Sequence, residues 1–235
     1  TNVIGDERPI KEITEYAHKN NILVVLDAAQ SIPHKKVDVR DLDIDFMAFS
    51  AHKMCGPTGV GVLYGKYDLL KELSPQNVGG GMNNDFESNM TYKYKEIPHK
   101  LEAGTPNIAG VIGLGSAIDY LNDIGIDKIE EYIKDLRKYA IDKMSTLKNI
   151  DIYNKHIKST TIIFNVRGVH SQDTATYLNK NGICVRAGNH CAKILKNETG
   201  VKNSIRVSLY FYNTKEEIDK LAKVLKNDNI INEVI

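Results

Sequence analysis

Lys53 stands in the segment SAHKMCGP at 50–57, between two apolar segments that each predict a β-strand, DIDFMAFS at 43–50 and GVGVLYG at 59–65. Lysine side chains are rarely buried without a partner, and burial lowers the pKa of the amine from its reference of ~10.4. An uncharged amine is a nucleophile that forms an imine with an aldehyde. A lysine after a strand is more often a solvated loop residue, so its surroundings decide between the two interpretations.

An aldehyde cofactor with a pyridine ring needs further groups around such an amine, and the sequence supplies each kind. Asp27 ends an apolar segment and can pair with a protonated ring nitrogen, while Gln30 can reach the neighbouring ring oxygen. Ser50 and His52 flank the lysine and are suited to binding a phosphate. If either residue stood alone, a helix N-cap would be the preferred interpretation of Asp27 and a turn residue that of Gln30. With Lys53, the four residues predict a cofactor site.

The elements that must position these residues follow from the apolar patterns. The segment ILVVLDAAQ at 22–30 is typical of a parallel strand buried on both faces, and 43–50 and 59–65 repeat the short-strand pattern. Apolar residues at helical spacing predict a helix over 10–19. Strands that alternate with helices predict an α/β sheet whose ligands lie beyond the carboxyl ends of the strands. The candidate residues fall at those ends.

A change of composition divides the rest of the chain. The region 74–107 is loop-like and contains GGG at 79–81, and loops of this length are usually functional or disordered. Two long helices follow, and we place a domain boundary that gives domains of 1–119 and 120–235. The second domain is expected to be α+β. Its predicted strands are 159–166, 182–188 and 204–213, and its later helices are 171–182 and 214–227, the last opened by a capping box of Thr214 and Glu217.

Charge and hydropathy exclude several classes of protein. The 235 residues carry 31 basic and 30 acidic side chains that are interspersed, which argues against a nucleic-acid partner. Apolar runs such as ILVVL are too short for a membrane span, and the first residues lack a secretory pattern. We therefore expect a cytoplasmic protein without a membrane partner. Because the sequence starts TNVIGDERPIKEI without an initiator methionine, we also expect a fragment.

The three cysteines, Cys55, Cys184 and Cys191, form no disulfide framework and suit a reducing compartment. We predict that Cys55 and Cys184 are buried as small apolar residues. Cys184, His190 and Cys191 match no zinc spacing, so no metal site is expected.

Five motifs carry a resemblance to a known family: DAAQ at 27–30, SAHKMCGPTGVGVLYG at 50–65, LEAGTPN at 101–107, RAGNHCA at 186–192 and IRVSLYFYNT at 205–214. Together they resemble the group II, or SufS-type, cysteine desulfurases, which are pyridoxal-phosphate (PLP) enzymes of aminotransferase class V. The resemblance implies the type I fold of PLP-dependent transferases. It also implies part of the large domain with a mostly parallel sheet, followed by a small C-terminal domain, with the N-terminal part of the enzyme missing.

The resemblance also implies roles for individual residues. Lys53 would carry the cofactor as an imine and act as catalytic base, and Cys191 would be the sulfur acceptor. Thr105 would reach the phosphate bound by the neighbouring subunit. The remaining implied ligands are Asp27, Gln30, Ser50 and His52 for the cofactor, and Asn2, Arg186 and Arg206 for the substrate. Asn189 departs from the family, whose members often carry a second histidine there.

The implied reaction converts L-cysteine to L-alanine and leaves a persulfide on Cys191, for iron–sulfur cluster assembly. The implied partners are a second copy of the chain, in a homodimer, and a sulfur-acceptor protein of the Suf system, either a scaffold or a zinc-bound sulfur transferase. Two alternatives stay open: a selenocysteine lyase or other class V enzyme, and an inactive fragment that lacks the N-terminal half of the site.

Overall fold

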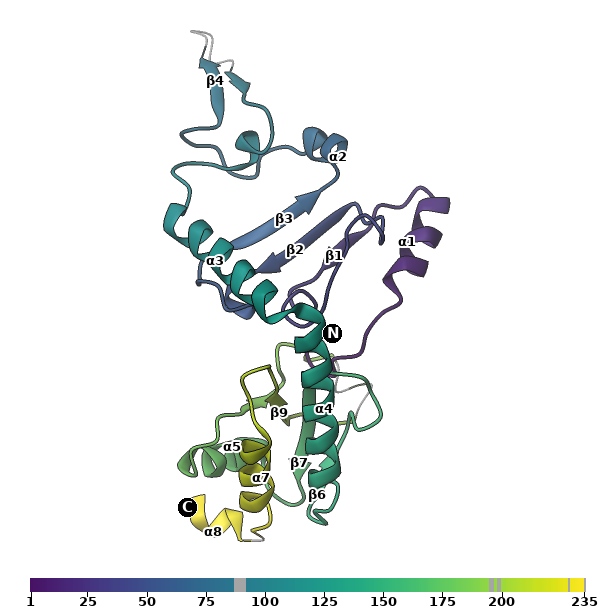
Figure 1. The fold of residues 1–235 in the computed structure, drawn as a ribbon, viewed down its shortest axis with the longest axis vertical. Helices are drawn as coiled ribbons and strands as arrows, with labels where there is room; N and C mark the ends of the chain where they lie inside the picture. The colour runs from purple at the N-terminus through teal and green to yellow at the C-terminus, as the bar shows by residue number, and fades with distance from the viewer. Residues whose placement is uncertain (87–91, 195–196, 198–199, 228, 235) are drawn as a thin grey trace. The chain divides into compact units, whose positions relative to one another are not determined.

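The computed structural model describes residues 1–86, 92–194, 197, 200–227 and 229–234 (Figure 1). The chain divides into two compact units. Unit 1 consists of Thr1–Arg8 and Gly125–Ile235, and unit 2 of Pro9–Ile124. Among the described residues, no helix is long and apolar enough to cross a membrane.

Unit 2 is built on a three-stranded sheet in the order β1-β2-β3. Strand β1 (Val25–Asp27) runs parallel to β2 (Phe46–Ser50), and β3 (Gly61–Gly65) returns antiparallel to β2. The three strands lie in the predicted segments. The sheet therefore combines one parallel and one antiparallel pair.

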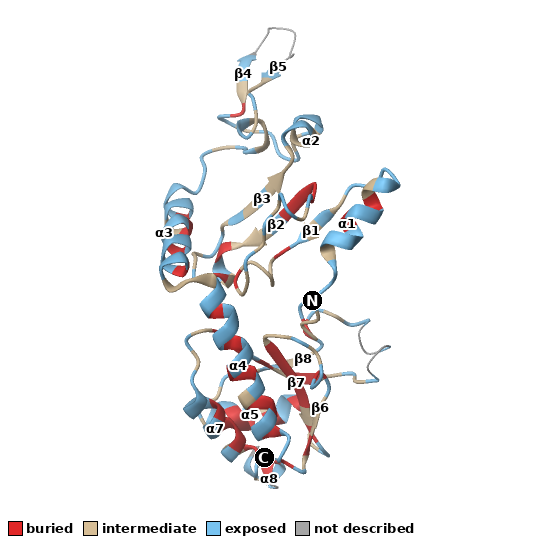
Figure 2. Cartoon of the chain, turned by 45° about the vertical axis from the view of Figure 1, so that its right-hand side comes forward, coloured by how far each residue is buried: buried red, intermediate tan, exposed pale blue. Residues whose placement is uncertain are grey.

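One face of this sheet is covered and the other is open. Met47 packs with Ala28 and Ile44 in a core that Ile10 of helix α1 (Ile10–Lys19) and several residues of 32–42 complete. On the opposite face, Val25 is 69% exposed and Leu63 is 54% exposed, and Figure 2 shows β1 in the colours of exposed and intermediate residues. The prediction that 22–30 is buried on both faces is therefore wrong for these described residues. The apolar run therefore has one buried face and one on which Val25 is exposed, while its register partner Phe46 on that second face is buried.

The region between β3 and the end of unit 2 contains more regular structure than the predicted loop. Helix α2 (Tyr67–Glu72) is followed by strands β4 (Asn83–Phe86) and β5 (Tyr92–Tyr94), which pair antiparallel, and by the 3-10 helix η2 (His99–Leu101). Helix α3 (Ile108–Ile124) then closes the unit. Its Gly110 and Gly113 lie against Val60 and Pro57, where added side chains would clash. The glycines let α3 lie close to the loop that follows Lys53.

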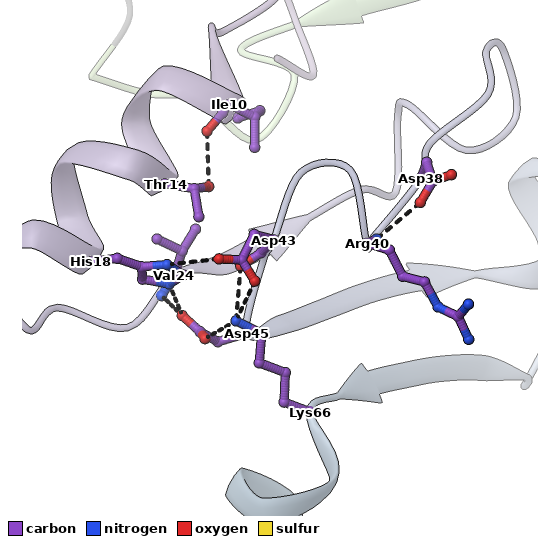
Figure 3. A network of polar contacts seen from close by, with 9 residues as sticks. All are labelled: Ile10, Thr14, His18, Val24, Asp38, Arg40, Asp43, Asp45 and Lys66. Carbon is purple, nitrogen blue, oxygen red and sulfur yellow. Dashed lines mark hydrogen bonds and ion pairs between the residues drawn. The ribbon is translucent and has the colours of Figure 1, made fainter.

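A polar network joins the elements of unit 2 at the end of the sheet where β2 begins (Figure 3). Asp45 is 3% exposed, and its carboxylate accepts hydrogen bonds from the Val24 N–H at 2.7 Å and from His18 Nε2 at 2.9 Å. Lys66 Nζ lies 3.0 Å from Asp45 and 2.7 Å from Asp43, and His18 Nδ1 lies 3.2 Å from Asp43. Both ring nitrogens of His18 thus face a carboxylate oxygen. Through His18 and Lys66, the network connects α1 and the residue that follows β3 to the 43–45 segment.

His34 makes the stability of unit 2 sensitive to mild acid. Burial lowers the pKa of its ring to about 4 from the usual 6.5, so the folded state binds fewer protons than the unfolded state below pH 6.5. We expect unfolding free energy to fall by about 2 to 3 kcal/mol between pH 6.5 and pH 4 from this group. Urea unfolding of wild type and His34→Gln at several pH values measures it. Parallel stability curves for the two proteins would rule the effect out.

Unit 1 has a four-stranded antiparallel sheet in the order β6-β7-β9-β8. The strands are β6 (Ile150–Ile152), β7 (Thr161–Val166), β8 (Arg186–Gly188) and β9 (Ser204–Ser208). Helices α4 (Ile126–Met144) and α5 (Ser171–Lys180) contact its strands, α7 (Lys215–Val224) packs against α4, and the short α8 (Ile230–Val234) lies beside α5 (Figure 1). The predicted capping box of α7 is confirmed, because Thr214 Oγ1 accepts from the Glu217 N–H and the Glu217 side chain accepts from the Thr214 N–H.

The first residues of the chain are held on this sheet by buried polar groups. Asn154 is 1% exposed, and its amide donates to the carbonyl oxygens of Ile4 and Thr161, each at 2.9 Å. The hydroxyl of Thr161 donates to the Val3 carbonyl at 3.0 Å. Arg137 of α4 donates to the carbonyl oxygens of Thr161 and Asn154 at 3.1 and 2.7 Å. Residues 1–8 are therefore an integral part of unit 1.

Candidate cofactor and nucleophile sites

The candidate cofactor residues of unit 2 gather at the carboxyl ends of the parallel pair β1 and β2. Asp27 is in register with Ala48, and Ser50 follows two residues later on the same face of the sheet. That face is the open one, and Asp27 is exposed on it. Its Oδ1 accepts a hydrogen bond from the Ala29 N–H at 2.9 Å, which fixes the carboxylate at the strand end. Gln30 follows in the turn after β1 and is half-buried.

Lys53 ends a single turn of 3-10 helix, η1 (Ala51–Lys53), that begins directly after β2. The turn is anchored by Ala51, which is fully buried, donates to the Val60 carbonyl and accepts from the N–H groups of Met54 and Gly56. His52 is exposed and Lys53 is half-buried. Lys53 is therefore not buried as the sequence argument assumed. Its position directly after a strand is as predicted.

Thr105 lies on a different loop from the other predicted cofactor ligands. It is exposed, and it follows Gly104, whose N–H donates to the Gly80 carbonyl at 2.8 Å. The structure thus brings Asp27, Ser50 and η1 to neighbouring strand ends and places Thr105 in the loop tied to the GGG segment.

The predicted substrate residues of unit 1 lie on adjacent strands. Arg186 of β8 is directly in register with Arg206 of β9. Arg206 Nη1 donates to the backbone carbonyl and the side-chain oxygen of Asn2 at 3.0 and 3.2 Å. Burial, followed by the positive charge of Arg186, lowers the pKa of Arg206, while Cys191 has the opposite effect. Two facing guanidinium groups repel each other, so an anion between them would be stabilised.

Cys191 lies beside this arginine pair. Its side chain is exposed, and Arg186 Nη2 donates to its sulfur at 3.3 Å. The neighbouring His190 is buried at 3% exposure and contacts Ser204, a residue that no sequence motif singles out. The left-handed backbone of His190 and Cys191, at φ of 51° and 64°, is equally invisible in the sequence because neither is glycine.

The other two cysteines are not where the sequence pattern placed them. Cys55 and Cys184 are both exposed, so the prediction that they are buried is wrong. Cys55 has a φ of 62° in the turn that follows η1, and Cys184 precedes the first residue of β8. Neither residue is inside a strand, which is why an apolar neighbourhood in sequence gave no burial in space.

A small open pocket adjoins the Cys191 turn within unit 1. Its lining includes Asn189, His190, Ala192 and Ser204 together with the apolar residues Val3, Ile4, Ile157, Ile163 and Val201. Among the described residues, no group of three or more metal-ligating side chains is brought together.

Residues 1–221 match the family Aminotransferase class-V, which is most of the chain. The chain belongs to the aminotransferase class V family. This family assignment confirms the class V part of the resemblance seen in the motifs.

The class V chain is similar to proteins described as cysteine desulfurases. It is 49% identical over 226 residues to a probable cysteine desulfurase of Halalkalibacterium halodurans, an alignment that covers 96% of this chain and 55% of the relative. It is 41% identical over 230 residues to a cysteine desulfurase of Haloferax volcanii, covering 96% of this chain and 53% of the relative. The chain therefore spans about half the length of the curated relatives it matches.

Solved structures of this class give the same result. The cysteine desulfurase CsdA of Escherichia coli, in an S-sulfonic acid form, superposes with a TM-score of 0.92 at 38% identity, over 100% of this chain and 58% of the other. A cysteine desulfurase of Thermococcus onnurineus NA1 has a TM-score of 0.92 at 36% identity, over 96% and 57%. These likenesses confirm the predicted α/β fold of the class V family.

The residues at the strand ends of unit 2 fit the cofactor that the resemblance implies. They comprise a carboxylate for a ring nitrogen, an amine for an aldehyde, and a hydroxyl and an imidazole for a phosphate. The carboxylate and the hydroxyl lie on the same face of the sheet, where Asp27 is exposed and Ser50 is half-buried. The donor set and its accessibility suit PLP.

Proposed function

We propose that this chain contributes the cofactor-binding lysine and the sulfur-accepting cysteine of a group II cysteine desulfurase. The observation that carries the proposal is the placement of Cys191, an exposed thiol that receives a hydrogen bond from Arg186 beside the register partner Arg206. A nucleophilic thiol next to a paired cationic site suits a substrate that offers both a carboxylate and a sulfur atom. L-Cysteine is the simplest such substrate, and the similar relatives are described as cysteine desulfurases.

In this proposal, residues of unit 2 hold PLP. Lys53 would bind the aldehyde, Asp27 would face the ring nitrogen and Gln30 the ring oxygen, with Ser50, His52 and Thr105 as phosphate ligands. Bound PLP supplies an electron sink that acidifies the Cα–H bond of an attached amino acid. Lys53 Nζ then takes the Cα proton as general base.

The groups of unit 1 would bind the substrate and accept its sulfur. The guanidinium of Arg206, oriented by Asn2, offers two parallel N–H donors to the substrate carboxylate, and Arg186 adds a second positive charge. The Cys191 thiolate attacks the substrate sulfur, so that a new S–S bond forms and the substrate Cβ–S bond breaks. The electron pair of that bond stays with the carbon, which takes up a proton. L-Cysteine and the Cys191 thiol thus become L-alanine and a persulfide.

The proposed product dictates the proposed partners. A persulfide on an exposed residue is accessible to a second thiol, so we assign a sulfur-acceptor protein of the Suf type as partner, feeding iron–sulfur cluster assembly. A homodimer in which Thr105 reaches the neighbouring subunit's phosphate, and a cytoplasmic location with reduced thiols, complete the proposal. A selenocysteine lyase would use the same lysine and arginines and is distinguished by its substrate.

Replacing Cys191 with serine is expected to lower alanine release from L-cysteine at least about 10³-fold, because the serine oxygen is a poor acceptor of sulfur. Binding of PLP, followed by absorbance, should stay unchanged. Mass spectrometry of the peptide that contains residue 191 should show an added sulfur atom only in the wild type.

The matched control is Cys184→Ser, an exposed cysteine of the same unit, which should retain wild-type rates. Wild-type alanine release by Cys191→Ser contradicts the proposal. Release from selenocysteine alone points to the lyase, and failure of the purified wild-type protein to bind PLP points to an inactive fragment.

A further inference from the structure

The thiol of Cys191 is presented by a tight turn with an unfavourable backbone. The Ala192 N–H donates to the Asn189 carbonyl at 2.8 Å, and the two residues between them, His190 and Cys191, have φ values of 51° and 64°. Positive φ at both central positions is the type I′ arrangement, which glycine and asparagine adopt most readily. Neither residue is one of these. Contacts outside the turn must therefore hold its conformation.

The side chain of His190 makes such a contact. It is 3% exposed, and its Nε2 lies 3.0 Å from the carbonyl oxygen of Ser204 and 3.1 Å from the Ser204 hydroxyl. A carbonyl oxygen can only accept, so Nε2 carries the proton of the neutral ring. Nδ1 is then the unprotonated nitrogen, which agrees with its being buried without a hydrogen-bond partner among the described residues.

The charges around His190 keep its ring neutral. Burial, the positive charge of Arg206 and that of Arg186 lower the pKa of His190, against the opposing hydrogen bond with Ser204. At neutral pH the ring thus has a single N–H, and the Ser204 carbonyl receives it.

The backbone of the turn is held from its other side as well. The side-chain amide of Asn2 donates to the His190 carbonyl at 3.0 Å, and Asn2 also accepts from Arg206. Ser204 is in register with Gly188 of β8, two residues from the Arg186 and Arg206 pair. The contacts of His190 therefore hold the turn against β9, which carries Arg206 and pairs with β8, the strand of Arg186.

We propose that His190 is a positioning residue, whose Nε2–H bond to the Ser204 carbonyl holds Cys191 in the left-handed turn with its sulfur against Arg186. The effect of this anchor on the reaction rests on the proposed function of Cys191. The anchor itself is a property of unit 1 and is measured without cofactor or substrate.

The protonation state of the ring gives the first test. Nitrogen NMR of the wild-type protein labelled with ¹⁵N-histidine, at neutral pH, should show His190 with a protonated Nε2 and an unprotonated Nδ1. The opposite tautomer cannot donate to the Ser204 carbonyl and would overturn the proposal. Because this measurement needs no substitution, it decides the question even where a variant does not fold.

Hydrogen exchange of the Ala192 amide gives the second test, since that amide closes the turn. In His190→Ala we expect exchange at least about 10-fold faster than in wild type, because local opening is no longer opposed by the anchor. His190→Gln keeps an amide donor of similar reach and should stay within about 3-fold of wild type. His156→Ala, at an exposed histidine of the same unit, is the matched control and should change nothing.

Alkylation of Cys191 connects the anchor to the thiol. With Cys55 and Cys184 replaced by serine, iodoacetamide reports on Cys191 alone. We expect His190→Ala to change the alkylation rate about 3-fold or more and His190→Gln to restore it, because the contact with Arg186 depends on the turn. A folded His190→Ala protein with unchanged exchange and alkylation would overturn the inference. Alanine release that does not need Cys191 would instead overturn the proposed function and leave the anchor standing.

Discussion

Lys53→Ala is expected to abolish covalent retention of PLP and to lower alanine release from L-cysteine at least about 10³-fold, because one amine serves as both attachment point and general base. Borohydride treatment of the wild-type protein with PLP should fix the cofactor on the Lys53 peptide, as seen by mass spectrometry. The alanine variant should show no such adduct at any residue of η1.

The matched control for this prediction is Lys36→Ala, at an exposed lysine of the same unit. It should keep both the adduct and the wild-type rate. If borohydride fixes PLP on another lysine, or if Lys53→Ala turns over like the wild type, then the strand-end site of unit 2 is not the cofactor site.

Asp45→Ala is expected to lower the free energy of unfolding of unit 2 by about 3 kcal/mol, because the Val24 N–H, the His18 ring and the Lys66 ammonium lose their buried acceptor. The carboxylate is 4% exposed and contacts Val24, His18 and Lys66. Burial raises the pKa of Asp45, but the hydrogen bonds from Val24, His18 and Lys66 outweigh it and the pKa is lowered. Its contribution is therefore present above the ordinary value of 3.8 and is lost as pH falls below it.

Urea unfolding followed by circular dichroism measures this effect. Asp43→Ala is the matched control, because Asp43 contacts the same His18 and Lys66 but is 64% exposed, so water replaces it with a much smaller loss. Equal stabilities of the two variants would contradict the prediction. The acid range of Asp45 lies below that of His34, so the two contributions separate on the pH axis.

Local patterns predicted several helices and strands of the chain. The capping box of Thr214 and Glu217, the helix over 10–19 and the strand before Lys53 all depend on residues close in sequence, and each is present in the structure. The place of Asp27 and Ser50 at neighbouring strand ends also followed, because parallel pairing brings carboxyl ends to one edge.

Burial was harder to predict, because it depends on what packs against a residue. Val25 has the sequence of a buried strand residue, yet it is 69% exposed in the structure. Cys55 and Cys184 sit among apolar neighbours in sequence, but both are exposed and lie outside the strands. Lys53 differs in the same way, because the sequence argument assumed a buried amine and the structure leaves the residue half-buried.

Within the candidate site, side chains whose role is set by distant contacts escaped the sequence patterns. Ser204 matters through the imidazole of His190, and this contact joins β9 to the turn after β8, fourteen positions earlier. Asn2 was expected at the substrate, and the structure adds its bond to the His190 carbonyl across 188 positions. Such pairings have no local signature, since only the sheet register brings the partners together.

Residues 1–8 belong to unit 1, and this affects the order of folding during synthesis. Val3 and Ile4 emerge from the ribosome well before their partners Thr161 and Asn154, which follow 158 and 150 positions later. Unit 2 is continuous from 9 to 124 and can fold in the meantime, whereas contacts this distant form slowly and late. The bond from Asn2 to the Cys191 turn spans even more of the chain. A chain whose synthesis stops after Cys191 but before β9 is complete therefore has a thiol that is not yet held for reaction.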